Sequence, residues 1–252
     1  MDLFSIFPPM KPFLLLQHRY LDEASDNEYE AVLTYSGLQP QQMFRVRMEQ
    51  QSIAGLSLAD FSGVITGGGP ANVSDAEEIK RPEQLRFEQE LELMYEEIFE
   101  KDFPYLGMCY GMGSITRFLG GQVSKEKFGE PVGAVTISLN KNENDPILAG
   151  IPDSFTAFAG HKEACQLLPE KAILLASSPD CPVQMLRCKN NIYATQFHPE
   201  LDAKGIVVRI ICYRNHGYFK PEEADTLIGQ VQRDEVIYPQ RILRNFIERY
   251  LK

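Results

Sequence analysis

The first half of the chain alternates short apolar runs with longer stretches of helical periodicity. Residues 11–18 and 61–70 each contain a run typical of a parallel strand that is buried on both faces. Residues 22–38, between these runs, predict a helix that ends at Gly37. Residues 82–101 predict a second helix, with apolar side chains on one face and glutamates on the other. This alternation indicates an α/β fold.

The same pattern continues in residues 103–108, which predict a further strand, and in residues 109–121, which predict a turn and a helix. From residue 122 to residue 196 the pattern changes to short β-like runs, and after Pro199 it becomes helical again. Two loops that follow predicted strands, T-G-G-G-P and G-M-C-Y-G, are rich in glycine. Because sites in such sheets form where the carboxyl ends of strands open into loops, we expect the functional site there.

The length and composition fit one domain. A chain of 252 residues with 44% hydrophobic and 24% charged residues suits a single α/β domain over residues 1–252, with a C-terminal helical extension from about residue 203. The net charge of −10 disfavours a surface that tracks phosphates, so we expect no nucleic-acid partner.

The N-terminus and the cysteines bear on the compartment. The first 20 residues lack the features of a signal peptide, and no apolar run approaches the ~20 residues of a membrane span. The five cysteines lie far apart and form no CxxC pair, which favours neither a disulfide framework nor a metal site. We therefore expect a cytoplasmic protein with no membrane partner, no metal and no cofactor.

One cysteine stands in a distinctive setting. Cys109 is the centre of a G-x-C-x-G sequence, between Gly107 and Gly111, after a predicted strand and before a predicted helix. The nucleophile elbow of hydrolases has this form, with a tight turn that glycines relieve. A helix N-terminus favours a thiolate. A structural cysteine, the alternative, needs none of these features.

A nucleophilic thiolate needs a base, and the base needs a group that orients it. His198 and Glu200 lie two residues apart in Q-F-H-P-E, and Pro199 biases His198 toward an extended conformation. Both side chains then point to one side, so the carboxylate can fix the imidazole tautomer. The alternative is a strand end followed by a helix that begins at proline.

Acyl transfer also requires donors for the developing oxyanion. The backbone N–H groups of Gly68 or Gly69 are candidates in the glycine-rich loop, and the N–H of Tyr110 follows the nucleophile directly. A phosphate-binding loop is the rival interpretation, but no G-K-[ST] follows the glycines.

The motifs G-G-P, G-x-C-x-G and H-P-E, in this order, resemble those of the class I glutamine amidotransferases over about Lys11 to Asp202. The tail is similar to that of stand-alone members related to the glutaminase domain of GMP synthetase. The resemblance implies a flavodoxin-like three-layer α/β/α sandwich that hydrolyses the glutamine side-chain amide. It implies that Cys109 forms a γ-glutamyl thioester, that His198 protonates the ammonia and that Glu200 orients His198.

The chain departs from the family pattern at positions that contact the substrate. The family usually has Gln or His four residues after the nucleophile, where this chain has Gly113. The S-H-G-D-like loop of the family appears as residues 160–163, in which His161 is a candidate substrate residue or an ordinary loop histidine. Arg19, after the first strand, is a candidate for binding a substrate carboxylate.

Three functions remain open from the sequence. The first is a glutaminase that acts on a small molecule and delivers ammonia to a separate synthetase subunit. The second is a γ-glutamyl hydrolase or peptidase that acts on γ-glutamyl conjugates, which Gly113 favours by widening the pocket. The third is a non-catalytic partner or sensor, against which the complete triad argues.

Overall fold

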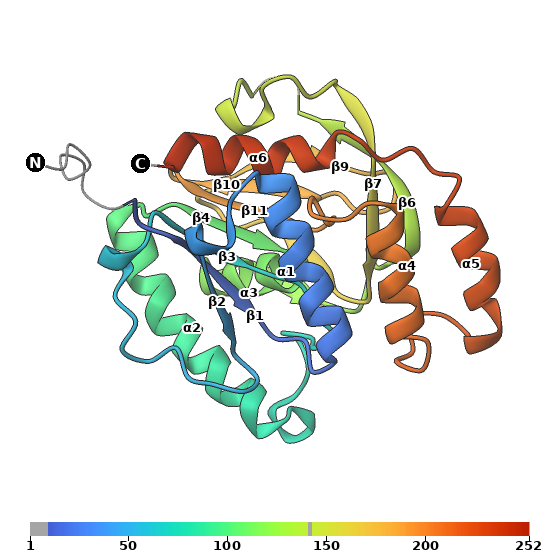
Figure 1. Ribbon diagram of the computed structural model, residues 1–252, viewed down its shortest axis with the longest axis horizontal. Helices are drawn as coiled ribbons and strands as arrows, with labels where there is room; N and C mark the ends of the chain where they lie inside the picture. Colours follow the sequence, from blue (N-terminus) through green and yellow to red (C-terminus); the bar gives the residue numbers. More distant parts are fainter. Residues whose placement is uncertain (1–9, 141–142, 252) are drawn as a thin grey trace, which may run out of the picture.

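The computed structural model describes residues 10–140 and 143–251 (Figure 1). Its core is a nine-stranded sheet with the order β2-β1-β3-β4-β11-β10-β9-β6-β7, and β5 and β8 form a second, two-stranded sheet. The strands are β1 (Phe13–Gln17), β2 (Met43–Arg47), β3 (Gly63–Thr66), β4 (Tyr105–Met108), β5 (Gln122–Ser124), β6 (Glu130–Leu139), β7 (Ser154–His161), β8 (Ala164–Leu167), β9 (Ala172–Ser177), β10 (Met185–Cys188) and β11 (Ile192–Thr195). The α-helices are α1 (Asp22–Ser36), α2 (Pro82–Lys101), α3 (Tyr110–Phe118), α4 (Ala203–Cys212), α5 (Ala224–Val231) and α6 (Pro239–Tyr250).

Helices cover both faces of the sheet, and β1 shows why the apolar runs lack alternation. Leu14 and Leu16 pack into a cluster with side chains of α2 and α3, whereas Phe13 and Leu15 pack into a second cluster with α1 and α6. The strand β1 is therefore apolar on both sides. The three-layer α/β/α arrangement predicted from the sequence is confirmed.

The two halves of the sheet differ in strand direction. Strands β2, β1, β3, β4 and β11 are parallel neighbours, so their carboxyl ends share one edge. Strands β10, β9, β6 and β7 continue the sheet in antiparallel pairs. Figure 1 shows α4 and α5 beside β6 and β7, whereas α6 packs against α1.

Most predicted elements are present. The first helix ends where Gly37 adopts the left-handed conformation, at φ 77°, and α2 spans the predicted residues 82–101. The edge strand β2 and the short strands β5 and β8 were not predicted, because only Met43 and Val46 of β2 are buried and β5 has three residues. Among the described residues, no helix is long and apolar enough to cross a membrane.

Candidate active site

Cys109 occupies a strained turn between β4 and α3. Its backbone has φ 53° and ψ −98°, a conformation that costs energy for any residue with a side chain. Its N–H donates to the carbonyl oxygen of Thr195 at 2.8 Å, and its carbonyl oxygen accepts from the N–H of Gly113 at 3.1 Å. A Cβ atom on Gly111 would lie 2.5 Å from the backbone oxygen of Thr66. The turn therefore excludes a side chain at this flanking position, as the elbow motif predicts.

His198 and Glu200 follow the neighbouring strand. Thr195, the last residue of β11, is in register with Met108, the last residue of β4, so the two chains leave the sheet side by side. The N–H of His198 donates to the carbonyl oxygen of Phe158 in β7 at 2.9 Å. Its Nδ1 contacts Glu200 Oε1 at 2.8 Å. The predicted pairing of imidazole and carboxylate is present, and it leaves Nε2 to face away from Glu200.

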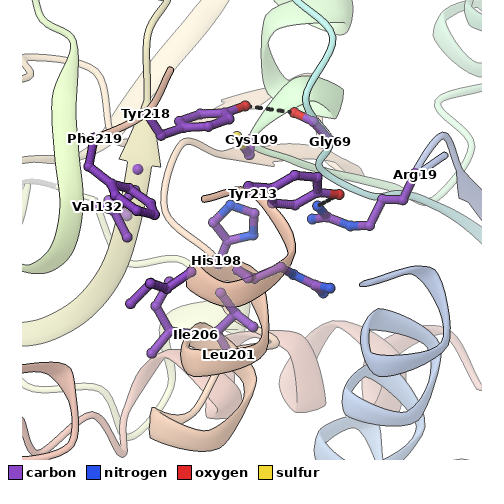
Figure 2. A pocket seen from close by; sticks show the side chains of 14 residues that line it. Arg19, Gly69, Cys109, Val132, His198, Leu201, Ile206, Tyr213, Tyr218 and Phe219 are labelled. Atoms are coloured by element: carbon purple, nitrogen blue, oxygen red, sulfur yellow. Dashed lines mark hydrogen bonds between the residues drawn. The ribbon is translucent and has the colours of Figure 1, made fainter. Parts of the chain in front are cut away.

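The structure brings Cys109 and His198 together around Gly68. A Cβ atom on Gly68 would lie 2.7 Å from His198 Cε1 and 3.2 Å from Cys109 Cβ. Both side chains line one hollow (Figure 2). The three residues predicted as a triad therefore converge at the carboxyl edge of the parallel strands.

Electrostatics hold His198 in its charged form. Burial opposes the charge, but the Glu200 carboxylate and then Cys109 outweigh it and raise the pKa of His198 from 6.5 to about 10. Glu200 is fully buried. Burial alone would raise its pKa, but His198 and then Arg209 and Arg19 lower the pKa of Glu200 from 4.5 to about 2. At neutral pH the pair is an imidazolium and a carboxylate.

The three predicted oxyanion donors have different surroundings. The N–H of Gly68 donates to Glu28 Oε1 at 3.3 Å, so it is already engaged. Gly69 lies beside Cys109, and a side chain on Gly69 would collide with buried His18, whose Cε1 would lie 2.1 Å from the added Cβ. Tyr110 is the first residue of α3, where N–H groups lack intrahelical acceptors. Of the three, the N–H of Gly68 is thus the one that already has an acceptor.

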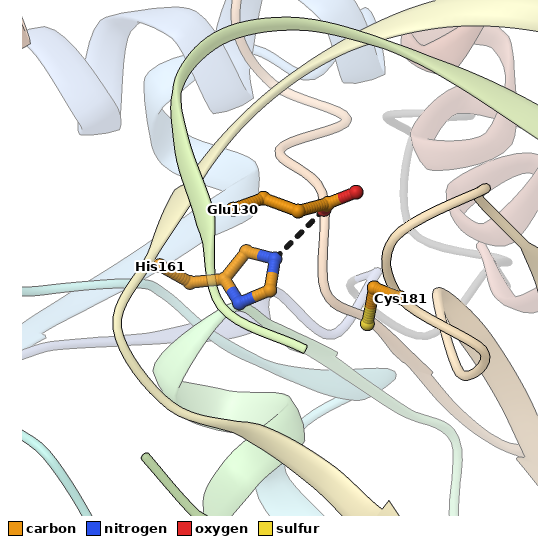
Figure 3. Close-up of side chains that lie close together, drawn as sticks. All are labelled: Glu130, His161 and Cys181. Carbon is orange, nitrogen blue, oxygen red and sulfur yellow. Dashed lines mark hydrogen bonds and ion pairs between the residues drawn. The ribbon is translucent and has the colours of Figure 1, made fainter. Parts of the chain in front are cut away.

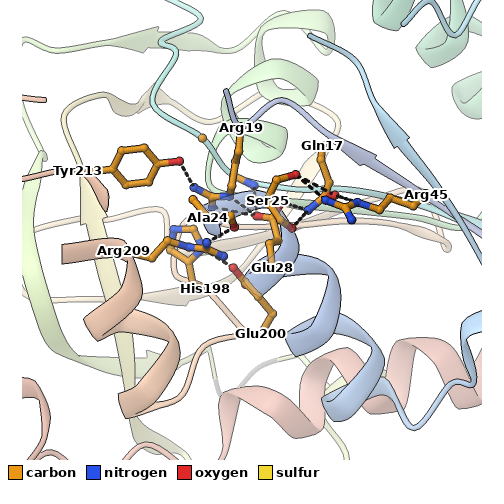
Figure 4. Close-up of polar contacts among 12 residues, drawn as sticks. Gln17, Arg19, Ala24, Ser25, Glu28, Arg45, His198, Glu200, Arg209 and Tyr213 are labelled. Carbon is orange, nitrogen blue, oxygen red and sulfur yellow. Dashed lines mark hydrogen bonds and ion pairs between the residues drawn. The ribbon is translucent and has the colours of Figure 1, made fainter. Parts of the chain in front are cut away.

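Arg19 takes part in a buried ion pair beside the site (Figure 4). Its guanidinium lies 2.8 Å from Glu28 Oε1 and donates to the hydroxyl of Tyr213 at 3.1 Å. Glu28 also accepts from the side-chain amide of Gln17 at 2.8 Å and from the N–H of Gly68, so the ion pair helps to hold the Gly68 loop. Arg19 also lines the hollow at Cys109, and its expected role in binding a substrate carboxylate stays a prediction.

His161 belongs to a buried polar cluster on β6 and β7 (Figure 3). Its Nε2 contacts Glu130 Oε2 at 2.9 Å and its Nδ1 contacts the carbonyl oxygen of Glu163 at 2.9 Å. Glu130, His161 and Cys181 carry ligand-type atoms that lie within 4.8 Å of one another. Burial raises the pKa of Cys181 to about 12, so its thiol keeps its proton and donates to the carbonyl oxygen of Val183. With both ring nitrogens engaged, His161 positions Glu163.

Gly113 borders a polar hollow of about 330 Å³ beside Cys109. A Cβ atom on Gly113 would lie 3.3 Å from Glu163 Oε1. The Glu163 carboxylate accepts from the N–H groups of Val73 at 2.8 Å and Ser74 at 2.9 Å. It therefore fills the space into which a longer residue 113 would extend. Lys162 lines the same hollow, so both charges are available there.

A second hollow, of about 470 Å³, lies on the His198 side of Cys109. Figure 2 shows Tyr213, Tyr218 and Phe219 over it, from the segment between α4 and α5. The hydroxyl of Tyr218 donates to the carbonyl oxygen of Gly69 at 3.4 Å. These three residues, Glu28 and Arg209 were not predicted from the sequence, since no motif marks them. Their aromatic and charged types were the only available signal.

A family model described as glutamine amidotransferase class-I matches residues 26–220. The GMP synthase (glutamine-hydrolyzing) of Caldicellulosiruptor saccharolyticus is 34% identical over 140 residues, which are 55% of this chain and 24% of that protein. The corresponding protein of Lactobacillus delbrueckii subsp. bulgaricus is 36% identical over 141 residues, again 55% of this chain and 24% of that protein. The chain thus aligns with about a quarter of the length of these curated relatives.

Solved structures agree with the fold. A glutamine amidotransferase of Thermotoga maritima superposes with a TM-score of 0.75 at 22% identity, over 95% of this chain and 98% of that chain. A glutamine amidotransferase of Methylobacillus flagellatus gives a TM-score of 0.73 at 19% identity, over 96% of each chain. These superpositions confirm the predicted flavodoxin-like fold.

Proposed function

Because the chain belongs to the class I glutamine amidotransferase family, we propose that it hydrolyses the side-chain amide of glutamine through a thioester on Cys109 and releases ammonia. The observation that carries this proposal is the convergence of the strained Cys109 with the paired His198 and Glu200. An imidazolium beside a sulfur at a helix N-terminus is the setting in which a thiolate nucleophile is stable.

The reaction follows from these positions. The Cys109 sulfur attacks the δ-carbonyl carbon, and the N–H groups of Gly69 and Tyr110 receive the oxyanion. The carbon–nitrogen bond breaks as His198 donates its proton to the departing nitrogen, which leaves as ammonia. Water then attacks the thioester, His198 takes a proton from that water, and glutamate leaves. Glu200 keeps the imidazole oriented throughout.

The polar hollow suits the glutamate part of the substrate. Glutamine carries an α-ammonium and an α-carboxylate, and the hollow beside Cys109 is lined by Glu163 and Lys162. Glu163 is held in place by Val73 and Ser74, so a substrate ammonium would meet a fixed carboxylate. Burial raises the pKa of Glu163, and a cation next to it would lower that pKa.

We propose that a separate synthetase protein uses the ammonia. The support is the similarity to glutamine-hydrolysing GMP synthases, at 34% identity over 140 residues and 36% identity over 141 residues. A partner of the synthetase kind would supply the acceptor and the activating nucleotide.

The test is a glutaminase assay on the purified protein. Ammonia and glutamate should appear in equal amounts, and Cys109→Ala should abolish both. Cys165→Ala is the matched control, since Cys165 is buried and lies outside the site. Equal ammonia release by the wild type and by Cys109→Ala would refute the proposed mechanism.

A further inference from the structure

Two hollows meet at Cys109, and they differ in chemistry. The polar hollow is lined by Asn72, Lys162 and Glu163 but not by His198. The second hollow is lined by His198 and mainly by apolar side chains. Cys109, Gly69, Gly160 and Tyr218 line both. The sulfur therefore stands where two different parts of one substrate would join.

The position of His198 decides which part enters the second hollow. In amide cleavage the general acid must reach the leaving nitrogen, within about 3.2 Å or through one water. Because His198 lines only the second hollow, the leaving group departs into it, and the acyl part occupies the polar hollow. We propose that the chain cleaves γ-glutamyl amides of apolar primary amines, with the alkyl part in the second hollow. This proposal rests on the proposed function.

The lining of this hollow favours an apolar leaving group over ammonia. The hollow is open to solvent, so a longer alkyl part can extend out of it. Its walls are built from α4, the strands β6 and β7, and the segment over Cys109; the apolar residues that line it are Val132, Ala159, Leu201, Ile206, Ile210, Tyr213, Tyr218 and Phe219.

Its charged neighbours argue against a cationic leaving group. Arg19 and Arg209 also line the hollow. Those of their nitrogen atoms that lack a hydrogen-bond partner are buried, so they offer no exposed site for an anion. Their charges would repel a second cation, whereas an alkyl chain would meet mainly apolar surface.

The proposed step is the same acyl transfer with another amine. Cys109 attacks the side-chain carbonyl carbon, Cδ of the glutamyl group, and the carbon–nitrogen bond breaks. The leaving nitrogen takes the proton of His198 and departs as the free amine, and water hydrolyses the thioester to glutamate. Overall, one γ-glutamyl alkylamide and one water give glutamate and one alkylamine.

A matched set of substrates tests the proposal. It contains glutamine, γ-glutamyl methylamide, γ-glutamyl 3,3-dimethylbutylamide and its cationic isostere, the 2-(trimethylammonio)ethylamide. We expect kcat/KM for the dimethylbutylamide to exceed that for the methylamide by roughly 10–100-fold, because each buried methylene favours binding in the transition state. The cationic isostere should be at least roughly 10-fold poorer than the dimethylbutylamide, since it must leave water for a hollow lined by two arginines.

Phe219→Ala should lower the ratio of kcat/KM between the dimethylbutylamide and the methylamide, because it removes one apolar wall. Phe44→Ala is the control: Phe44 is 47% exposed on the edge strand β2, and its replacement should leave the ratio unchanged.

The outcomes separate the two proposals. Cys109-dependent turnover of glutamine, with the dimethylbutylamide no better than the methylamide, would overturn this inference and leave the glutaminase intact. A preference for the cationic isostere would also overturn it. The absence of Cys109-dependent turnover of every substrate would refute the proposed function itself.

Discussion

Replacing Glu200 with glutamine tests the electrostatic design of the site. The carboxylate is fully buried and lies 2.8 Å from His198 Nδ1. The pKa of His198 is raised from 6.5 to about 10, which means that its surroundings stabilise the charged imidazole over the neutral one by ~5 kcal/mol. Among the groups that raise it, Glu200 is the largest. In Glu200→Gln, burial and the nearby guanidiniums should make His198 neutral at pH 7.

The expected loss follows from the role of the imidazolium. Loss of the orienting carboxylate costs roughly 10⁴ in kcat of serine hydrolases. Because a thiol is the stronger nucleophile, we expect kcat/KM for glutamine to fall by roughly 10²–10³ here. The assay is steady-state release of glutamate across pH. The activity that remains should change with pH below neutrality, where the imidazole of the variant becomes protonated.

The chain provides a matched control for this experiment. Glu130 is also buried and also contacts a histidine, with its Oε2 2.9 Å from His161 Nε2. Because His161 positions the substrate-binding Glu163, Glu130→Gln should act on stability and KM but leave kcat of the folded protein unchanged. A loss of kcat/KM of less than roughly 10-fold in Glu200→Gln, or an equal loss of kcat in both variants, would refute this reasoning.

Three further results are expected. Glu200→Gln should lower the free energy of unfolding most strongly between pH 4.5 and 6.5, where urea titrations would measure it. This loss of stability should become smaller as the pH rises toward the His198 pKa of about 10, and also as it falls toward the Glu200 pKa of about 2. Gly111→Ala should lower stability by roughly 2 kcal/mol or more, since its Cβ would lie 2.5 Å from the Thr66 oxygen; an unchanged melting temperature would contradict this. Gly113→Gln should raise KM for glutamine more than it lowers kcat, because its side chain would displace Glu163. Steady-state kinetics, with Gly113→Ala as the control, would contradict this if kcat changed more than KM.

The sequence predicts those parts of the site that depend on neighbours in the chain. The elbow at Cys109 requires glycines two residues away on either side, and the pairing of His198 with Glu200 requires an extended segment. Both are local consequences of residue type, so they can be read without the fold. The sheet order that sets the two segments side by side was not predicted, because the run before His198 was recognised only as a short β-like segment.

Other parts depend on contacts between distant segments. Arg19 donates to Tyr213, which lies 194 residues further along the chain, and the ion pair between Arg19 and Glu28 depends on how α1 packs. The position of Arg19 at the strand end predicts that it lies near the site, but it does not show that a buried glutamate pairs with it. The apolar hollow was likewise not predicted, because the approach of Tyr218 and Phe219 to Cys109 depends on how α4 packs against the sheet.

The measurement that tests the central claim most directly is covalent capture of the nucleophile by 6-diazo-5-oxo-norleucine, a diazoketone analogue of glutamine. Peptide mapping by mass spectrometry would locate the label among the five cysteines. We predict labelling of Cys109 alone, protection by excess glutamine, and slower labelling in Glu200→Gln. Labelling of another cysteine, or labelling of Cys109 that glutamine does not slow, would contradict the assignment of this site to glutamine.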